Sequence, residues 1–99
     1  MILAYETFVG STNSNKFGLP QDTGTIVLQI TDKASGTTVD LKLQGSITLD
    51  GDMVDLIPEG ANSATVEAEG IYRYDGRGLA VIQTYGDTAD LKVEAVAAS

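Results

Sequence analysis

The stretch that decides the fold is Thr25-Ile-Val-Leu-Gln-Ile-Thr31, which follows Gly24 and is rich in β-branched residues. In an extended chain, successive side chains point to opposite sides. Alternation therefore divides the run into two faces: Ile26, Leu28 and Ile30 on one, and Thr25, Val27 and Gln29 on the other. The pattern predicts a central strand whose first face is buried.

The next stretch of chain repeats the same pattern. Asp32–Gly36 is typical of a hairpin loop, and Thr38–Gln44 alternates between apolar and polar residues. We expect one face to point inward and the other to meet water: Val39, Leu41 and Leu43 against Asp40, Lys42 and Gln44. Residues 46–49 extend this strand past a bulge at Gly45, and Asp50-Gly51 turns the chain toward a further strand at residues 53–57.

The last third of the chain is the most regular part. After a short strand at residues 64–68, three runs at 71–74, 79–85 and 89–96 are separated by compact glycine turns. This spacing predicts a meander of three neighbouring strands. Residues 79–82 are apolar on both faces, which favours a buried central position in the sheet.

The fold class that follows is all-β. Seven or eight short strands, spaced by roughly ten residues, predict a single small antiparallel β-sandwich or barrel-like domain over residues 21–99. No window sustains the 3.6-residue apolar period of a helix. Residues 1–20 differ, because an apolar opening with Ile2, Leu3, Tyr5 and Phe8 precedes a polar stretch without periodicity. We interpret them as an N-terminal arm and loop, in which Leu3–Val9 is either simply the first strand or an arm that docks on a partner, and the sequence does not choose between the two.

Composition bounds the chemistry. The 99 residues suffice for one domain, and they include no cysteine and no histidine. This excludes disulfides, Cys/His zinc sites, a thiolate nucleophile and a Ser-His-Asp triad, so we expect no enzyme, no catalytic residues and no cofactor. With 6 basic and 14 acidic residues the net charge is −8, which disfavours nucleic acid as a partner. No basic leader or long apolar run is present, so neither a secretory signal nor a membrane partner is expected.

Two clusters of side chains invite a functional interpretation. The carboxylates of Asp50, Asp52 and Asp55 are hard ligands of the kind that calcium prefers, but their spacing is not that of an EF-hand, so we predict a solvated acidic turn and no metal site. The same acids with Glu59 lack the apolar cleft that a glycosidase pair needs.

The second cluster is aromatic and basic. Tyr72, Tyr74 and Tyr85 lie near Arg73 and Arg77, and such groups are enriched at interfaces and on sugar-binding faces. The alternative is that the tyrosines belong to the core and that the arginines pair with neighbouring acids. The glycines at 76, 78 and 86 are predicted to be turn residues.

The run from Gly70 to Ala95, taken together with Thr25–Ile30 and Asp50-Gly51, resembles small β-sandwich proteins of tailed bacteriophage virions. These are capsid decoration (cement) proteins and related modules of heads or tail fibres. The resemblance covers roughly residues 24–97 and rests on a strand of the type Gly-Ile-Tyr-Arg-Tyr, a glycine turn and Gly-Leu-Ala-Val-Ile. This chain departs from the pattern at Met53-Val54, where an aromatic residue is usual.

The resemblance implies a non-enzymatic structural protein, made in the host cytoplasm, that binds the major capsid protein on the outside of the virion, often as a homotrimer. Three copies would carry −24 formal charges, so such an assembly needs an apolar patch or local charge pairing. The residues expected at the partner interface come from both ends of the chain: Ile2, Leu3, Tyr5, Phe8, Phe17, Tyr72, Tyr74 and Arg77. The alternative function is a carbohydrate-binding or other adhesion module of a tail or fibre.

Overall fold

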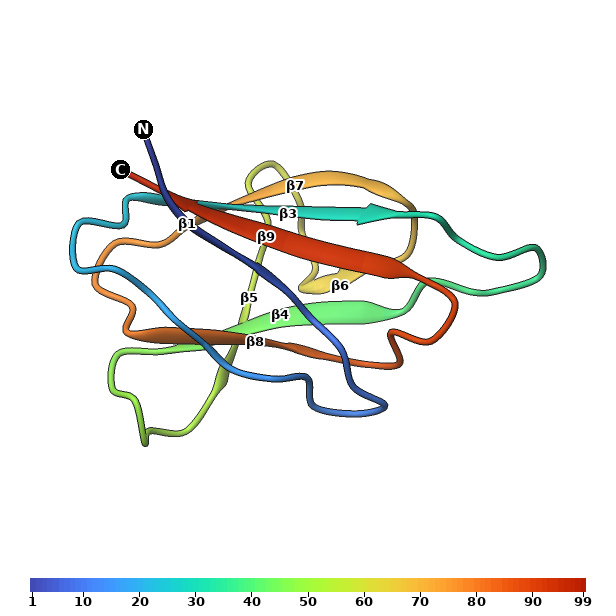
Figure 1. Ribbon diagram of the computed structural model, residues 1–99, viewed down its shortest axis with the longest axis horizontal. Helices are drawn as coiled ribbons and strands as arrows, with labels where there is room; N and C mark the ends of the chain where they lie inside the picture. Colours follow the sequence, from blue (N-terminus) through green and yellow to red (C-terminus); the bar gives the residue numbers. More distant parts are fainter.

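The computed structural model describes residues 1–99 as two stacked antiparallel sheets (Figure 1). The four-stranded sheet has the order β1 (Ile2–Thr7), β9 (Lys92–Ala98), β3 (Thr25–Thr31) and β7 (Gly70–Asp75). The five-stranded sheet has the order β2 (Phe17–Gly18), β8 (Val81–Tyr85), β4 (Leu41–Ser46) and β5 (Val54–Leu56), and β6 (Thr65–Val66) also pairs with β4. The all-β prediction is confirmed as a sandwich, with nine strands where seven or eight were expected. No helix is long and apolar enough to cross a membrane.

The core lies between the two sheets and is built by the alternation seen in the sequence. Ile26, Leu28 and Ile30 of β3 are fully buried, and β3 lies between β9 and β7 as a central strand. The facing side chains from the other sheet include Leu41 and Leu43 of β4. The predicted inward faces of these strands are therefore correct, and β8 is central in its sheet as expected.

Three predicted connections are wrong, because the strands that each one joins lie in different sheets. β3 and β4 belong to different sheets, so residues 32–36 cross the sandwich and form no hairpin. The amide of Ala34 donates to the carbonyl of Asp90 at 3.0 Å, which ties this crossing to the one before β9. β7, β8 and β9 also alternate between the sheets, so the expected meander does not exist. Alternation fixes which face of a strand is buried, but it does not specify the strand that pairs with it.

The connection from β4 to β5 is the one local hairpin of the five-stranded sheet. Its turn contains Asp50-Gly51, as predicted, but β4 ends at Ser46 and the expected extension over residues 46–49 is wrong. Gly45 pairs in regular register with both Ile82 and Val54, so no bulge is present there. A Cβ atom at Gly45 would lie 3.1 Å from the Leu56 and Leu79 side chains. Glycine is therefore favoured at this position because the two leucines pack closely against it.

The N-terminal segment is part of the sandwich. β1 pairs along β9, and the amide of Phe8 donates to the Val93 carbonyl at 2.8 Å. The polar stretch that follows is also bound to the five-stranded sheet, because the Ser14 amide donates to the Thr84 carbonyl at 2.9 Å and β2 pairs with β8. Of the two alternatives left open by the sequence, the first strand is therefore right and the docking arm is incorrect. A boundary at residue 20 separates no independent unit.

Candidate functional site

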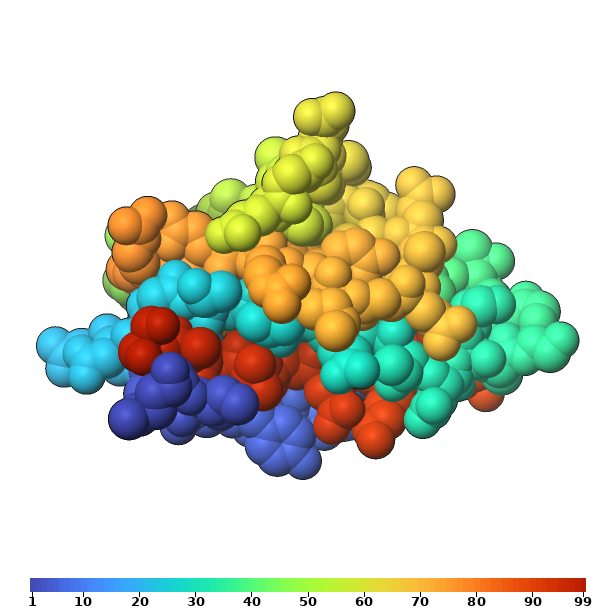
Figure 2. Space-filling model, turned by 90° about the horizontal axis from the view of Figure 1, so that it is seen from above, coloured from blue at the N-terminus to red at the C-terminus, as the bar shows by residue number.

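The outer face of the four-stranded sheet presents several apolar side chains to solvent. Figure 2 views it from above, with β1, β9, β3 and β7 side by side in blue, red, cyan and orange. The strand registers place Tyr5, Val96, Val27 and Arg73 in one row across the sheet. The next row is Thr7, Glu94, Gln29 and Ile71.

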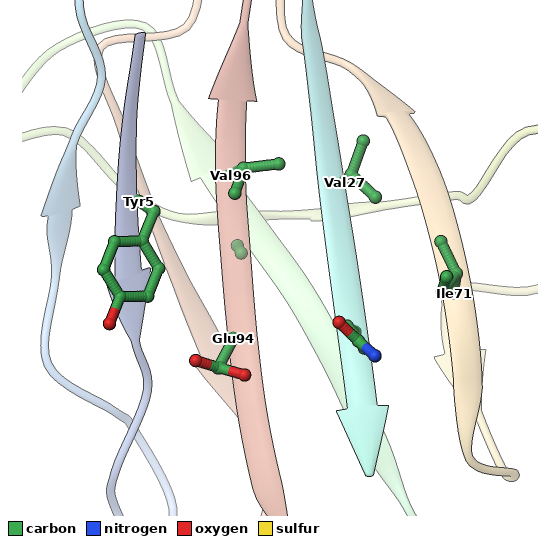
Figure 3. A pocket seen from close by; sticks show the side chains of 7 residues that line it. Tyr5, Val27, Ile71, Glu94 and Val96 are labelled. Atoms are coloured by element: carbon green, nitrogen blue, oxygen red, sulfur yellow. The ribbon is translucent and has the colours of Figure 1, made fainter. Parts of the chain in front are cut away.

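The residues of these two rows other than Arg73 and Thr7, together with Ala95, line a shallow hollow of about 230 Å³ (Figure 3). Tyr5 is 64% exposed and Ile71 is 56% exposed, so the largest apolar groups of the face lie on its two edge strands. Val96 and Val27 are half-buried between them on the central strands. The face therefore offers an apolar centre with polar groups interspersed, which is the composition of many protein interfaces.

The same face is electrically balanced. Its outward charged residues are Arg73 and Asp75 on β7 and Lys92 and Glu94 on β9, which is two of each sign. Lys92 and Glu94 lie 3.8 Å apart, while Arg73 makes no ion pair within the chain. Since the whole chain carries −8, the acidic excess lies on the other surfaces.

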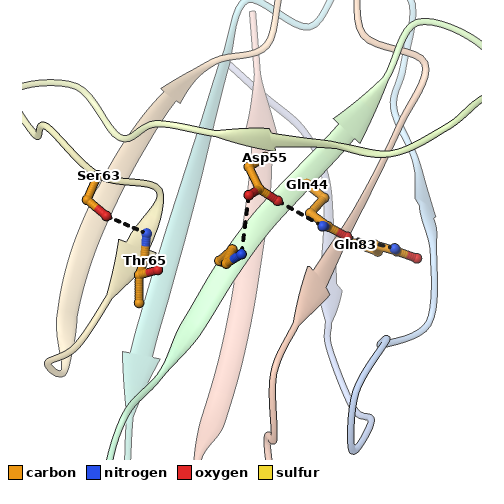
Figure 4. A network of polar contacts seen from close by, with 6 residues as sticks. Gln44, Asp55, Ser63, Thr65 and Gln83 are labelled. Atoms are coloured by element: carbon orange, nitrogen blue, oxygen red, sulfur yellow. Dashed lines mark hydrogen bonds and ion pairs between the residues drawn. The ribbon is translucent and has the colours of Figure 1, made fainter.

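The outer face of the five-stranded sheet is polar instead. The amide of Gln83 donates to the side chain of Gln44 at 3.0 Å, and Gln44 donates to Asp55 at 2.9 Å (Figure 4). Lys42 pairs with the same carboxylate at 3.3 Å and lies 5.5 Å from the ring centre of Tyr85. These hydrogen bonds, that of Gln44 first and then that of Lys42, lower the pKa of the Asp55 carboxyl.

A third surface lies at the end of the sandwich where the β4–β5 connection turns, at the left of Figure 1. Ile47 is 76% exposed and Leu49 is 63% exposed on this connection. Leu49 also lines an open hollow with Leu19 and Leu79. We call these four residues the apolar rim.

The structure separates the N-terminal residues that were expected at a partner interface. Ile2 and Tyr5 are exposed on β1 and Leu3 is half-buried. Phe8 and Phe17 are buried, with ring centres 6.4 Å apart, and belong to the core. Their assignment to an interface is wrong, because the segment that carries them pairs into the sandwich.

The tyrosine cluster is likewise divided. Tyr72 and Tyr74 share a strand face, as predicted, but that face opposes Ile26 and Leu28 and points into the sandwich. Tyr74 is 1% exposed, so its assignment to an interface is wrong, and burial raises the pKa of its hydroxyl. Tyr72 donates from its hydroxyl to the Ala68 carbonyl at 2.5 Å. The core interpretation of these two residues is the correct one.

Arg77 is exposed in the turn between β7 and β8. It binds the carboxylate of Asp75 with two nitrogens, at 3.1 and 3.0 Å. These hydrogen bonds lower the pKa of Asp75 to about 2. The alternative interpretation, in which the arginines pair with neighbouring acids, is therefore right for Arg77 and not for Arg73, and a partner interface at Arg77 stays a prediction.

The acidic turn does not gather its carboxylates. Asp55 points into the polar network of the five-stranded sheet. No group of three or more histidine, cysteine, aspartate or glutamate side chains is placed to hold a metal ion.

Sequence reasoning missed the outward residues of the four-stranded sheet. Alternation predicts that Val27 lies on the face of its strand opposite the buried one, and Val96 interrupts the polar series Asp90, Lys92 and Glu94. An apolar residue on the wet face of each of two strands was the available signal. Their proximity depends on the pairing of β3 with β9, which are distant in sequence.

These surfaces belong to a small antiparallel β-sandwich of nine strands, and that is the class of protein that the fold defines. The fold is similar to that in the crystal structure of the SPBc2 prophage-derived protein YomS, with a TM-score of 0.72. The two chains are 14% identical, and the likeness covers 97% of this chain and 92% of that chain. At this identity the likeness shows a shared fold. The sequence matches no protein-family model and no curated protein.

Proposed function

We propose that this chain is a non-enzymatic structural protein of a bacteriophage particle and that it decorates the outer surface of the head. The resemblance of residues 24–97 to phage virion modules supports this proposal, and the fold shared with a prophage-derived protein agrees with it. The observation that carries the proposal is the apolar rim, because a chain with a net charge of −8 exposes large aliphatic groups there.

The apolar rim is suited to insertion between protein subunits. Ile47 and Leu49 project from a connection that could enter a neighbouring crevice, and Leu19 and Leu79 border the hollow beside them. Full burial of an isoleucine or leucine side chain contributes about 1.5–3 kcal/mol relative to exposure. Two such side chains, repeated at every copy on a symmetric shell, supply affinity without a catalytic or metal centre.

The proposal is tested with particles assembled without this chain. The purified protein is added back, and the bound fraction is measured by co-sedimentation. The double variant Ile47→Lys with Leu49→Lys should lose binding by about tenfold or more, since it removes both aliphatic groups.

The control is Val9→Lys with Ile57→Lys, because both residues are exposed and lie outside the apolar rim. This variant adds the same charge and should bind as the unmodified protein does. Equal binding of both variants, or no binding of the unmodified protein to such particles, contradicts the proposal.

The polar face of the five-stranded sheet favours a second candidate, a carbohydrate-binding module of a phage tail or fibre. Gln44, Asp55 and Lys42 form a row of hydrogen-bonded polar groups beside the exposed ring of Tyr85, and sugar hydroxyls need such groups. Titration against a glycan array distinguishes this function. Binding that is lost in Gln44→Ala and Tyr85→Ala supports it, and no binding at millimolar sugar removes it.

A further inference from the structure

We propose that two copies of this chain pair face to face through the outer surfaces of their four-stranded sheets, related by a twofold axis that runs parallel to the strands between β9 and β3. The inference concerns self-association. It does not depend on the proposed role in a virion, and it uses a different surface from the apolar rim.

The charge distribution is the first argument for a second copy as the occupant. Two chains that each carry −8 repel one another unless the surfaces that meet are neutral. The outer face of the four-stranded sheet meets that condition, because Arg73 and Lys92 balance Asp75 and Glu94. A strongly basic or acidic partner would gain no net electrostatic attraction on this face. A second copy presents the same neutral face, so the two faces meet without net repulsion.

The strand registers give the second argument. A twofold axis parallel to the strands places β1 over the partner's β7 and β9 over the partner's β3, and it keeps each row opposite the same row. Val96 then meets Val27 of the other copy at the centre of the face. Tyr5 meets the otherwise unpaired Arg73, which suits a cation–π contact.

The second row matches as well. Glu94 falls opposite Gln29 of the other copy, so a carboxylate faces an amide that can donate to it. Ile71 falls opposite Thr7 at the edge. Each contact occurs twice, as an isologous interface requires.

A twofold axis perpendicular to the strands is less favourable. It would exchange the two rows and place Glu94 over Val96 and Arg73 over Ile71 of the other copy. Burying a charged group against an aliphatic side chain without a partner is costly. The parallel axis is therefore the arrangement that the face supports.

The size of the face sets the expected strength. Four strands of six or seven residues cover about 20 by 20 Å from strand spacing and rise, so a pair buries on the order of 1,000 Å² in total. This is at the lower end of specific interfaces. We expect a dissociation constant in the micromolar range, on the order of 1–100 μM.

Sedimentation equilibrium over a range of concentrations tests the inference. The mass of the unmodified protein should rise from 10.4 kDa toward about twice that value. Val27→Lys should raise the dissociation constant by about tenfold or more, since it sets an ammonium group against Val96 of the other copy. Val54→Lys is the matched control, because Val54 is exposed on β5 of the other sheet. Both variants lower the negative charge equally, so net charge cannot explain a difference.

A charge exchange tests the arrangement itself. Gln29→Glu places four carboxylates at the centre of the dimer and should weaken the association. The double variant with Glu94→Gln should restore the association, because two carboxylates again face two amides. Circular dichroism on every variant verifies folding. A monomer at all concentrations, a trimer of the kind implied by the resemblance, or equal association of the Val27→Lys and Val54→Lys variants overturns the inference.

Discussion

At the scale of single residues, Tyr74 is the clearest case of a side chain whose position has an energetic consequence. Its ring fills the core beside Ile26, but its hydroxyl finds no hydrogen-bond partner. A buried polar group without a partner costs about 1–3 kcal/mol. Tyr72, two residues earlier on the same face, satisfies its hydroxyl at the Ala68 carbonyl.

We therefore predict opposite effects for one chemical change at two positions. Tyr74→Phe should raise the free energy of unfolding by about 1 kcal/mol, because it removes an unsatisfied hydroxyl and keeps the ring. Tyr72→Phe should lower it by about 1 kcal/mol, because it removes a hydrogen bond. Urea denaturation of both variants measures the difference, and a Tyr74→Phe protein less stable than the unmodified one contradicts the account.

The Asp75–Arg77 pair makes a prediction about pH. Arg77 lowers the pKa of Asp75 from 3.8 to about 2 in the folded chain, so the pair favours the folded state above pH 3.8 and this contribution is lost as the pH falls through 2. Arg77→Gln should move the pKa of Asp75 back toward 3.8, as measured by carboxyl NMR titration. Arg73→Gln is the control, since Arg73 makes no ion pair, and it should leave the pKa of Asp75 at about 2. An unchanged pKa in Arg77→Gln would mean that another group holds the carboxylate.

Single residues were predictable from the sequence wherever alternation decides burial. Ile26, Leu28 and Leu41 are buried as their strand periods require. Tyr74 was left between core and interface, because a tyrosine suits both and only the pairing of β7 with β3 turns its face inward. Phe8 was assigned to an interface because no local period shows that β1 joins a sheet.

At the scale of elements, the N-terminal segment is a strand of the sandwich and not a docking arm. β1 covers one edge of β9, and Phe8 closes the core against Phe17. We predict that Phe8→Ala lowers the free energy of unfolding by about 3–5 kcal/mol through the cavity it leaves. Val9→Ala, at a side chain that is 68% exposed, should change it by less than about 0.5 kcal/mol. Thermal or urea denaturation compares the two, and equal small effects would indicate an arm that contributes little to the fold.

The elements themselves were largely predictable, and their pairing was not. β3, β4 and β6 appear where β-branched alternation placed them, and the Asp50-Gly51 turn joins β4 to β5. The sequence did not predict that the chain crosses between the sheets at residues 32–40 and in the glycine turns before and after β8. A turn sequence specifies a change of direction, whereas tertiary packing selects the sheet to which the next strand belongs.

At the scale of the whole molecule, the acidic excess and the apolar surfaces are arranged separately. The outer face of the four-stranded sheet is neutral and apolar, the outer face of the five-stranded sheet is polar, and the apolar rim lies at one end. The resemblance to virion modules predicted a chain that associates, and the net charge of −8 meant that association needs an apolar or charge-paired surface. The sequence did not show the outer face of the four-stranded sheet, because the residues of that face come from four strands distant in sequence.

The central claim is that this chain is a structural part of a phage particle. The most direct measurement is quantitative mass spectrometry of particles purified from the source of this chain, with its copy number compared to that of the major capsid protein. The account predicts a ratio near one to one, or a simple fraction set by capsid symmetry. A few copies per particle would indicate a tail or fibre part in place of decoration, and complete absence from purified particles would contradict the claim.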